Sequence, residues 1–268
     1  MKHAFLAGSL AALFVAATAA AQNKPPQVQV SKTAAADLKS NDGAKIRAAL
    51  DDVRLGGKTA GAPYVAPIVA LLDKGMTPEL TMAAIDTLGD LEAQQASQAI
   101  AEYMQHRSVR VRQAAVKALA KTKGPAAVRG LVKGLSDRDA MVRGVAANAL
   151  GAMKAKTAVP DLFLALDHRV NEAATSIGML CDAAECEKLG ARIGKIPFDV
   201  ASAGVEQALF RSDVSDDTKI KLLGRIRELG TREANKFLSD TAKKWPKTGS
   251  ARIKQALDQA VQATGGGS

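Results

Sequence analysis

The two cysteines of the sequence stand five positions apart, in the segment Cys181-Asp-Ala-Ala-Glu-Cys186. Two residues at this spacing within one uninterrupted helix would lie too far apart for a disulfide. The preceding apolar run ends at about Leu180, however, and Asp182 is suited to cap a following helix. Because such a break can bring the two sulfur atoms together, we expect a disulfide in an oxidising compartment. The alternative, a bound metal ion, lacks further ligands nearby.

Motifs for catalysis are nearly absent from the rest of the chain. No motif places a Ser, Cys or carboxylate beside His106 or His168. Both histidines lie near predicted repeat junctions. The pair Gly194-Lys195 lacks the upstream Gly and the following Ser or Thr of a phosphate-binding loop. We therefore expect no catalytic residues, no metal and no cofactor, and interpret the chain as not being an enzyme.

The chain is strongly basic. It carries 37 Lys and Arg against 27 Asp and Glu in 268 residues, which gives a formal net charge of +10. A positive surface attracts anionic partners. Aromatic residues make up only 3% of the chain and no nucleic-acid reader motif is present, so nucleic acid is disfavoured as the partner. The charge indicates another protein with an acidic surface or, as the alternative, an anionic polymer or lipid surface of the cell envelope.

The N-terminus has the form of a secretory signal peptide. Lys2 precedes an apolar run over residues 4–15, and the small residues Ala19-Ala20-Ala21 come before Gln22. This pattern predicts a signal peptide over 1–21 that is cleaved after Ala21, and hence a periplasmic or secreted protein. A membrane anchor is the alternative, but the apolar stretch is short for a spanning helix. We expect a flexible arm over 22–40 and a disordered Gly-rich tail over 263–268.

The middle of the chain repeats itself at a fixed interval, from one leucine at position 88 to the next at 119 and a third at 150. Such a period indicates stacked repeats. Three predicted helices start at a capping residue, at positions 77, 108 and 139, and each continues with apolar residues at helical spacing. Strand patterns are absent. The residues that recur at this interval are Leu88, Leu119 and Leu150; Ala84, Ala115 and Ala146; and Thr77, Ser108 and Asp139.

A looser form of the pattern extends the repeats in both directions. It predicts further first helices of a repeat, starting at Gly43, Asp167, Asp217 and Ser250. Second helices are predicted to follow the first, among them residues 126–135, 184–193 and 233–242. An extra helix is expected at about 200–210, and the pattern loses its regularity over 181–215.

The segment 135–166, with its core Asp139-Ala-Met-Val-Arg143, resembles a HEAT repeat of the short bacterial kind that also occurs in phycobilin lyases. Residues 108–119 are similar. The resemblance covers about residues 41–262 and implies a right-handed α-α superhelix, a HEAT or armadillo-like solenoid of about five to seven helix pairs. Most such arrays bind other proteins. A chromophore lyase would be the enzymatic alternative, by family analogy alone.

Two groups of basic residues have different interpretations. Arg112 and Arg143 occupy the same repeat position, where the resemblance favours hydrogen bonds to loop carbonyls or to a neighbouring Asp over a basic ladder for a ligand. Other cations lie on or just beyond the predicted second helices, which the resemblance places on the concave side. Arg129 and Lys133 share one outward stripe because they are four residues apart. The candidate partner-binding residues are Arg129, Lys133, Lys188, Arg192 and Lys236.

Together these features predict a non-catalytic scaffold or adaptor of the cell envelope or periplasm that binds another protein on the solenoid surface. The alternative is a binder of anionic envelope polymer or lipid through the basic face. The two differ in salt dependence, because binding to a polyanion fades steeply at high ionic strength whereas an apolar groove retains affinity.

Overall fold

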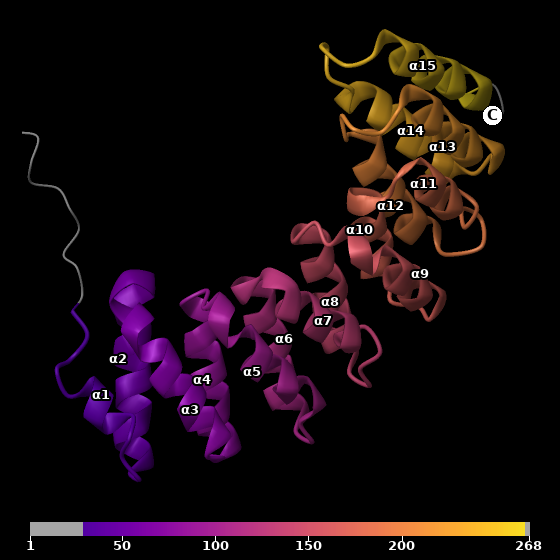
Figure 1. Ribbon diagram of the computed structural model, residues 1–268. Helices are drawn as coiled ribbons and strands as arrows, with labels where there is room; N and C mark the ends of the chain where they lie inside the picture. The colour runs from indigo at the N-terminus through magenta and orange to yellow at the C-terminus, as the bar shows by residue number, and fades with distance from the viewer. Residues whose placement is uncertain (1–28, 266–268) are drawn as a thin grey trace, which may run out of the picture.

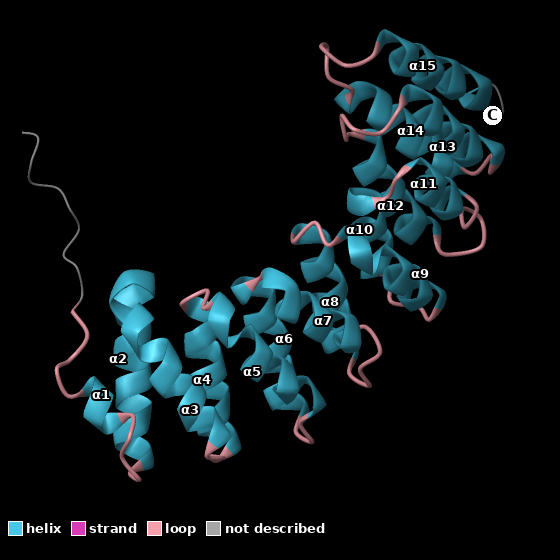
Figure 2. Ribbon diagram, viewed as in Figure 1, coloured by secondary structure: helices cyan, strands magenta, loops and turns pink. Residues whose placement is uncertain are grey.

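The computed structural model describes residues 29–265. Within this range every regular element is a helix, as Figure 2 shows, so the all-α prediction is confirmed. The predicted signal peptide over 1–21 lies outside the described residues, as do residues 22–28 of the predicted arm and 266–268 of the predicted tail.

The helices of residues 29–265 follow one another in chain order along the molecule (Figure 1). Short 3₁₀ turns at Ala62–Tyr64, Gln94–Ala96, Tyr103–Gln105 and Lys156–Ala158 join or extend some of them. The α-helices are α1 (Ala34–Asp37), α2 (Gly43–Gly61), α3 (Val65–Asp73), α4 (Pro78–Asp90), α5 (Ser97–Glu102), α6 (Val109–Thr122), α7 (Gly124–Gly134), α8 (Ala140–Ala152), α9 (Val159–Asp167), α10 (Glu172–Leu180), α11 (Ala183–Gly190), α12 (Phe198–Leu209), α13 (Asp216–Glu228), α14 (Arg232–Lys244) and α15 (Ala251–Gly265).

The predicted helix starts at 77, 108 and 139 are confirmed. The side chains of Thr77 and Asp139 accept hydrogen bonds from the backbone N–H groups three residues further on, which are otherwise unsatisfied at a helix start. Ser108 makes no such side-chain bond. The start predicted at Asp167 is wrong, because Asp167 is the last residue of α9 and α10 begins only at Glu172.

The helices stack in two parallel rows. The first row holds α2, α4, α6, α8, α10, α12 and α14, and neighbours in this row pack against one another. The second row holds α3, α5, α7, α9, α11, α13 and α15, so the described residues form seven helix pairs. Ion pairs join neighbours within a row, as between Lys221 of α13 and Glu187 of α11 (2.5 Å) and between Lys244 of α14 and Glu206 of α12 (3.1 Å).

The irregular segment inverts the expected order of the last helices. The sequence predicts α13 and α15 as first helices of a repeat and residues 233–242, within α14, as a second helix. The structure instead packs α13 on α11 and α15 on α13, while α14 stacks on α12. The extra helix expected at 200–210 is present as α12, and a single inserted helix exchanges the rows of every helix that follows.

The core includes the apolar helix stripe whose residues recur at the repeat interval. Leu88, Leu119 and Leu150 are completely buried, and the alanines of the same period fill the space between neighbouring helices. Helices α10 and α12 approach each other closely, because a Cβ atom on Gly178 would lie 1.9 Å from the carbonyl oxygen of Gly204. Small side chains thus set the distance between helices in the first row.

Helical structure begins within the arm predicted over 22–40. Residues 34–37 form α1, which packs on α2. Ala34 and Leu38 are almost completely buried there. Burial of these two apolar side chains holds the segment against α2, although the polar residues around it favoured a flexible arm.

Candidate partner-binding surface

The face of α7 carries the two cations that the sequence places on one stripe. Arg129 and Lys133 are both exposed, four residues apart on the same side of the helix. Among the described residues neither has a carboxylate within ion-pair distance. Arg129 Nη2 donates only to the side-chain oxygen of Gln98 on α5, at 3.4 Å. These two positive charges are therefore not neutralised within the described part of the chain.

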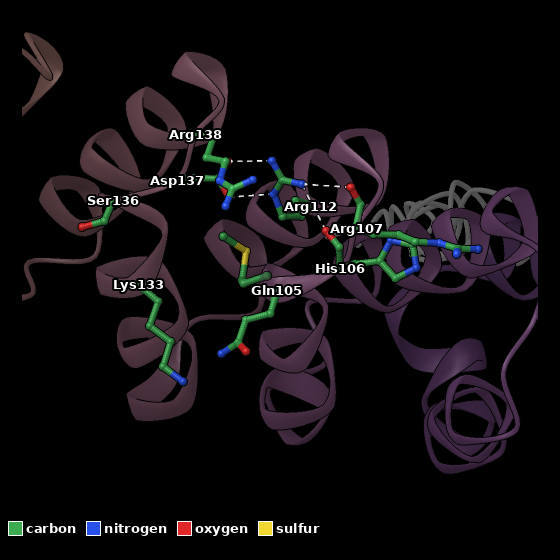
Figure 3. A pocket seen from close by; sticks show the side chains of 9 residues that line it. Gln105, His106, Arg107, Arg112, Lys133, Ser136, Asp137 and Arg138 are labelled. Carbon is green, nitrogen blue, oxygen red and sulfur yellow. Dashed lines mark hydrogen bonds and ion pairs between the residues drawn. The ribbon is translucent and has the colours of Figure 1, made fainter.

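A hollow of about 730 Å³ opens beside Lys133, between α7 and the turn before α6 (Figure 3). Figure 3 shows the Arg112–Asp137 pair at one end of the hollow and Lys133 at the other, with Gln105 between them. Its lining residues come from two consecutive turns between repeats and from the helices beside them. They are Met104, Gln105, His106, Arg107, Arg112, Lys133, Ser136, Asp137 and Arg138.

Arg112 and Asp137 form the most shielded ion pair of the hollow. Arg112 Nε and Nη2 donate to the two carboxylate oxygens of Asp137 at 2.7 and 2.9 Å. Burial alone would raise the pKa of Asp137, but the hydrogen bonds from Arg112 and from the N–H of Asp139, with the nearby positive charges, hold it below its ordinary value. The pair joins α6 to the turn before α8.

Arg112 and Arg143 repeat one set of contacts. Arg112 Nη1 donates to the carbonyl oxygens of His106 and Arg107, at 3.1 and 3.4 Å. Arg143 Nη1 donates to those of Asp137 and Arg138, at 2.8 and 3.0 Å. The predicted structural role is confirmed for both arginines, because their guanidinium groups hold the turn that precedes their own helix.

His106 has a matching structural role. Its Nδ1 accepts from the N–H of Ser108 at 3.1 Å, and the carboxylate of Asp137 accepts from the N–H of Asp139 at 2.8 Å in the next repeat. A histidine and an aspartate thus fix equivalent turns of two consecutive repeats.

Lys188 and Arg192 lie on the second row, at α11 and just beyond it. Lys188 is exposed. Arg192, in contrast, is paired, since its Nε and Nη2 donate to Asp167 at 2.8 and 2.7 Å and its guanidinium lies 4.7 Å from the centre of the Phe163 ring. This contact joins α11 to α9 and leaves little of the Arg192 charge for a partner.

Lys236 does not share a surface with the other candidates. It lies on α14, which the inserted helix puts in the first row, whereas α7 and α11 belong to the second. Its Nζ also pairs with Asp240 at 2.8 Å. The five candidates therefore do not form one continuous basic groove, and Arg129 with Lys133 is the pair that the structure brings together unneutralised.

The cysteines lie at the break between α10 and α11. Cys181 and Cys186 are bonded, with sulfur atoms 2.09 Å apart and Cα atoms 5.2 Å apart, and both are completely buried. Asp182 and Glu185 form a reciprocal cap at the start of α11, which turns the chain between the two cysteines. Arg211 Nη1 donates to the carbonyl of Cys181 at 2.9 Å and ties the bridge to the end of α12.

Neither a metal site nor a membrane span is found among residues 29–265. No group of three or more His, Cys, Asp or Glu side chains there is placed to hold a metal ion. Among the helices of this range, none combines the length and the hydropathy that a membrane-spanning segment requires.

Sequence reasoning missed Arg107 and Arg138, which line the hollow next to Lys133. Both are exposed. Their spacing was the available signal, because it equals the repeat interval and places them at the same point of consecutive turns.

Comparison with known proteins agrees with the repeat architecture. A family model described as HEAT repeats matches residues 65–135. No curated protein matches the chain. The molecule is therefore an α-α solenoid of HEAT-like repeats.

Solved structures with a similar fold span natural and engineered proteins. The complex of CpcE and CpcF of phycocyanin lyase from Nostoc sp. PCC7120 is 19% identical, with a TM-score of 0.45, and the match covers 93% of this chain and 99% of that one. An engineered protein of the Northeast Structural Genomics Consortium is 16% identical, with a TM-score of 0.50 and coverage of 88% and 69%. Human deoxyhypusine hydroxylase is 16% identical, with a TM-score of 0.38 and coverage of 87% and 95%.

The expectation that the chain is not an enzyme has to be corrected. The structures compared above include a lyase complex and a hydroxylase. A repeat-solenoid fold without familiar motifs does not by itself exclude catalysis. At such low sequence identities the likeness concerns the fold alone, and no reaction is transferred from these proteins to this chain.

Proposed function

We propose that this chain is a protein-binding scaffold of the cell envelope or periplasm, and that it binds its partner through the exposed face of α7. The observation that carries the proposal is the pair Arg129 and Lys133, which are exposed, adjacent and without a carboxylate partner among the described residues. Unneutralised like charges raise the free energy of the isolated protein slightly, and an acidic partner surface relieves this.

Two further features support the compartment. Residues 1–21 have the pattern of a cleaved signal peptide, and a buried disulfide is typical of oxidising compartments. We expect the mature protein from the native host to begin at Gln22. N-terminal sequencing of protein purified from its native compartment tests this, and full-length chain in the cytosol would contradict it.

The binding face is tested by affinity capture from an envelope extract with the double variant Arg129→Glu/Lys133→Glu as bait. Proteins retained by the unmodified chain should be lost, whereas the melting temperature should change little, because exposed charges contribute little to folding. The matched control is Lys45→Glu/Arg227→Glu, which makes the same change of charge at exposed residues of α2 and α13.

Capture that survives in the first variant, or that is lost equally in both, would refute α7 as the binding face. Ionic strength separates the polymer or lipid alternative. Retention that disappears completely at high salt, with no protein enriched over the control, would favour an anionic polymer over a protein partner.

A further inference from the structure

A row of arginines follows the turns that join one repeat to the next. Arg107, Arg138 and Arg169 recur at the repeat interval, in the turns before α6, α8 and α10. All three are exposed, and among the described residues none of their side chains has a hydrogen-bond or ion-pair partner. We call these three residues the turn arginines.

The turns that carry the first two turn arginines are hydrogen-bonded to the helix that follows each of them. The backbone carbonyl oxygens of Arg107 and Arg138 accept hydrogen bonds from Arg112 and Arg143, so each turn is clamped by the helix that follows it. Arg169 differs from the other two in backbone conformation, with a φ of 65°, but lies at the same position of the repeat. A clamped backbone reduces the entropy lost when these side chains bind a ligand.

The opposite edge of the solenoid provides an internal comparison. There, the turns within each repeat place Glu92, Lys123 and Lys154 at equivalent positions, again at the repeat interval. This row is not of one sign, and Glu92 pairs with Lys58 at 2.7 Å. The edge with the turn arginines is therefore the one on which three successive repeats present the same unpaired charge.

Carboxylates on the arginine edge do not neutralise the row. Asp137 is bound to Arg112, Asp167 is bound to Arg192, and Asp139 caps α8. Lys133 adds another cation in the hollow between the first two turn arginines. The hollow offers space for side chains of a ligand that passes from Arg107 to Arg138.

We propose that the turn arginines bind an extended acidic segment of a partner protein, one carboxylate to each repeat. Neighbouring helices in a packed row lie about 10 Å apart, which sets the approximate distance between consecutive arginines. An extended polyproline-type chain rises about 3.1 Å per residue, so acidic residues at every third position match this interval. The inference rests on the proposed protein-binding function and names the chemistry of the partner.

The test uses two fluorescent peptides with the same composition. In the first, four Glu residues alternate with pairs of Pro, which keeps the chain extended with Glu at every third position. In the second, the same four Glu residues are consecutive and the Pro residues follow. We expect fluorescence anisotropy to give a dissociation constant at least fivefold lower for the spaced peptide, and this preference should weaken as salt is added.

The triple variant Arg107→Gln/Arg138→Gln/Arg169→Gln should weaken binding of the spaced peptide roughly tenfold, as expected for three exposed charge pairs. The matched control is Lys123→Gln/Lys154→Gln/Lys156→Gln, which removes three exposed charges from the opposite edge of the same repeats. The control should change the dissociation constant less than twofold.

Three outcomes would overturn the inference: equal binding of the two peptides, equal losses in the two triple variants, or binding of phosphatidylglycerol vesicles with no binding of the spaced peptide. Capture by the Arg129→Glu/Lys133→Glu variant is a separate measurement. If capture depends on Arg129 and Lys133 but not on the turn arginines, the edge is wrong and the proposed function stands. If neither the unmodified chain nor the variants capture any protein while the spaced peptide still binds to the unmodified chain, the proposed function fails. The assignment of the turn arginines as a site for acidic segments then remains.

Discussion

Arg112 on α6 binds both carboxylate oxygens of Asp137, which stands 25 residues further on in the turn before α8. The same guanidinium holds two carbonyl oxygens of the turn before its own helix. One side chain thus links two consecutive turns between repeats, and the hollow beside Lys133 opens against this link (Figure 3).

We expect Asp137→Asn to lower the free energy of unfolding by about 2 to 4 kcal/mol at neutral pH, because it leaves a largely buried guanidinium without its counter-charge. Urea denaturation measures this. Asp90→Asn is the matched control, since Asp90 pairs with Lys121 on the exposed surface and should contribute under about 1 kcal/mol. A similar cost for both variants would contradict the special role of the Arg112–Asp137 pair.

The same pair should make stability depend on pH in a defined direction. The pKa of Asp137 is lower in the folded protein than its ordinary value of 3.8. Its ionised form therefore stabilises the fold above pH 3.8, and this contribution is lost as the pH falls below that value. The difference in stability between the unmodified protein and Asp137→Asn should shrink over this acidic range. A difference that stays constant down to about pH 3 would show that ionisation of Asp137 does not contribute.

Leu119→Ala should cost about 2 to 5 kcal/mol, because Leu119 is completely buried on the shared apolar stripe. Leu55→Ala is the control, since 68% of Leu55 is exposed. Chemical denaturation of the two variants side by side provides the measurement. A change below half a kcal/mol at Leu119 would mean that the stripe does not form the core.

Gly178→Ala should destabilise the protein by about 3 kcal/mol, because the added methyl group has no space against the backbone of Gly204. Gly224→Ala in α13 has no atom within 4 Å of its new Cβ and should stabilise its helix by about 0.5 to 1 kcal/mol. Thermal melts of both variants check the opposite signs. Two equal effects would refute the close approach of α10 and α12.

The native protein should show no free thiol until it is reduced and unfolded, because Cys181 and Cys186 are bonded and buried. Closing so short a loop contributes roughly 2 kcal/mol in the chain-entropy model. Alkylation followed by mass spectrometry counts the thiols, and denaturation of Cys181→Ala/Cys186→Ala measures the contribution. Two thiols that react in the unreduced native protein would contradict the bridge.

The sequence by itself determined the class of fold and the position of most helices. Both depend on local information, because a capping residue and an apolar stripe specify a helix without reference to distant residues. The repeat period also identified Leu119 as core, and the resemblance to HEAT repeats favoured a structural role for Arg112 and Arg143. The row of turn arginines was present in the same period but was not recognised.

The tertiary structure alone decided which row each helix occupies. One inserted helix, α12, moves Lys236 to the row opposite Arg129, although both lie on helices with the same sequence pattern. The tertiary structure also decided which cations are neutralised, since Arg192, just after α11, meets Asp167 at the end of α9 only in the folded chain. Both outcomes depend on contacts between residues distant in the chain, and a local sequence pattern carries no information about which neighbours helix packing will bring together.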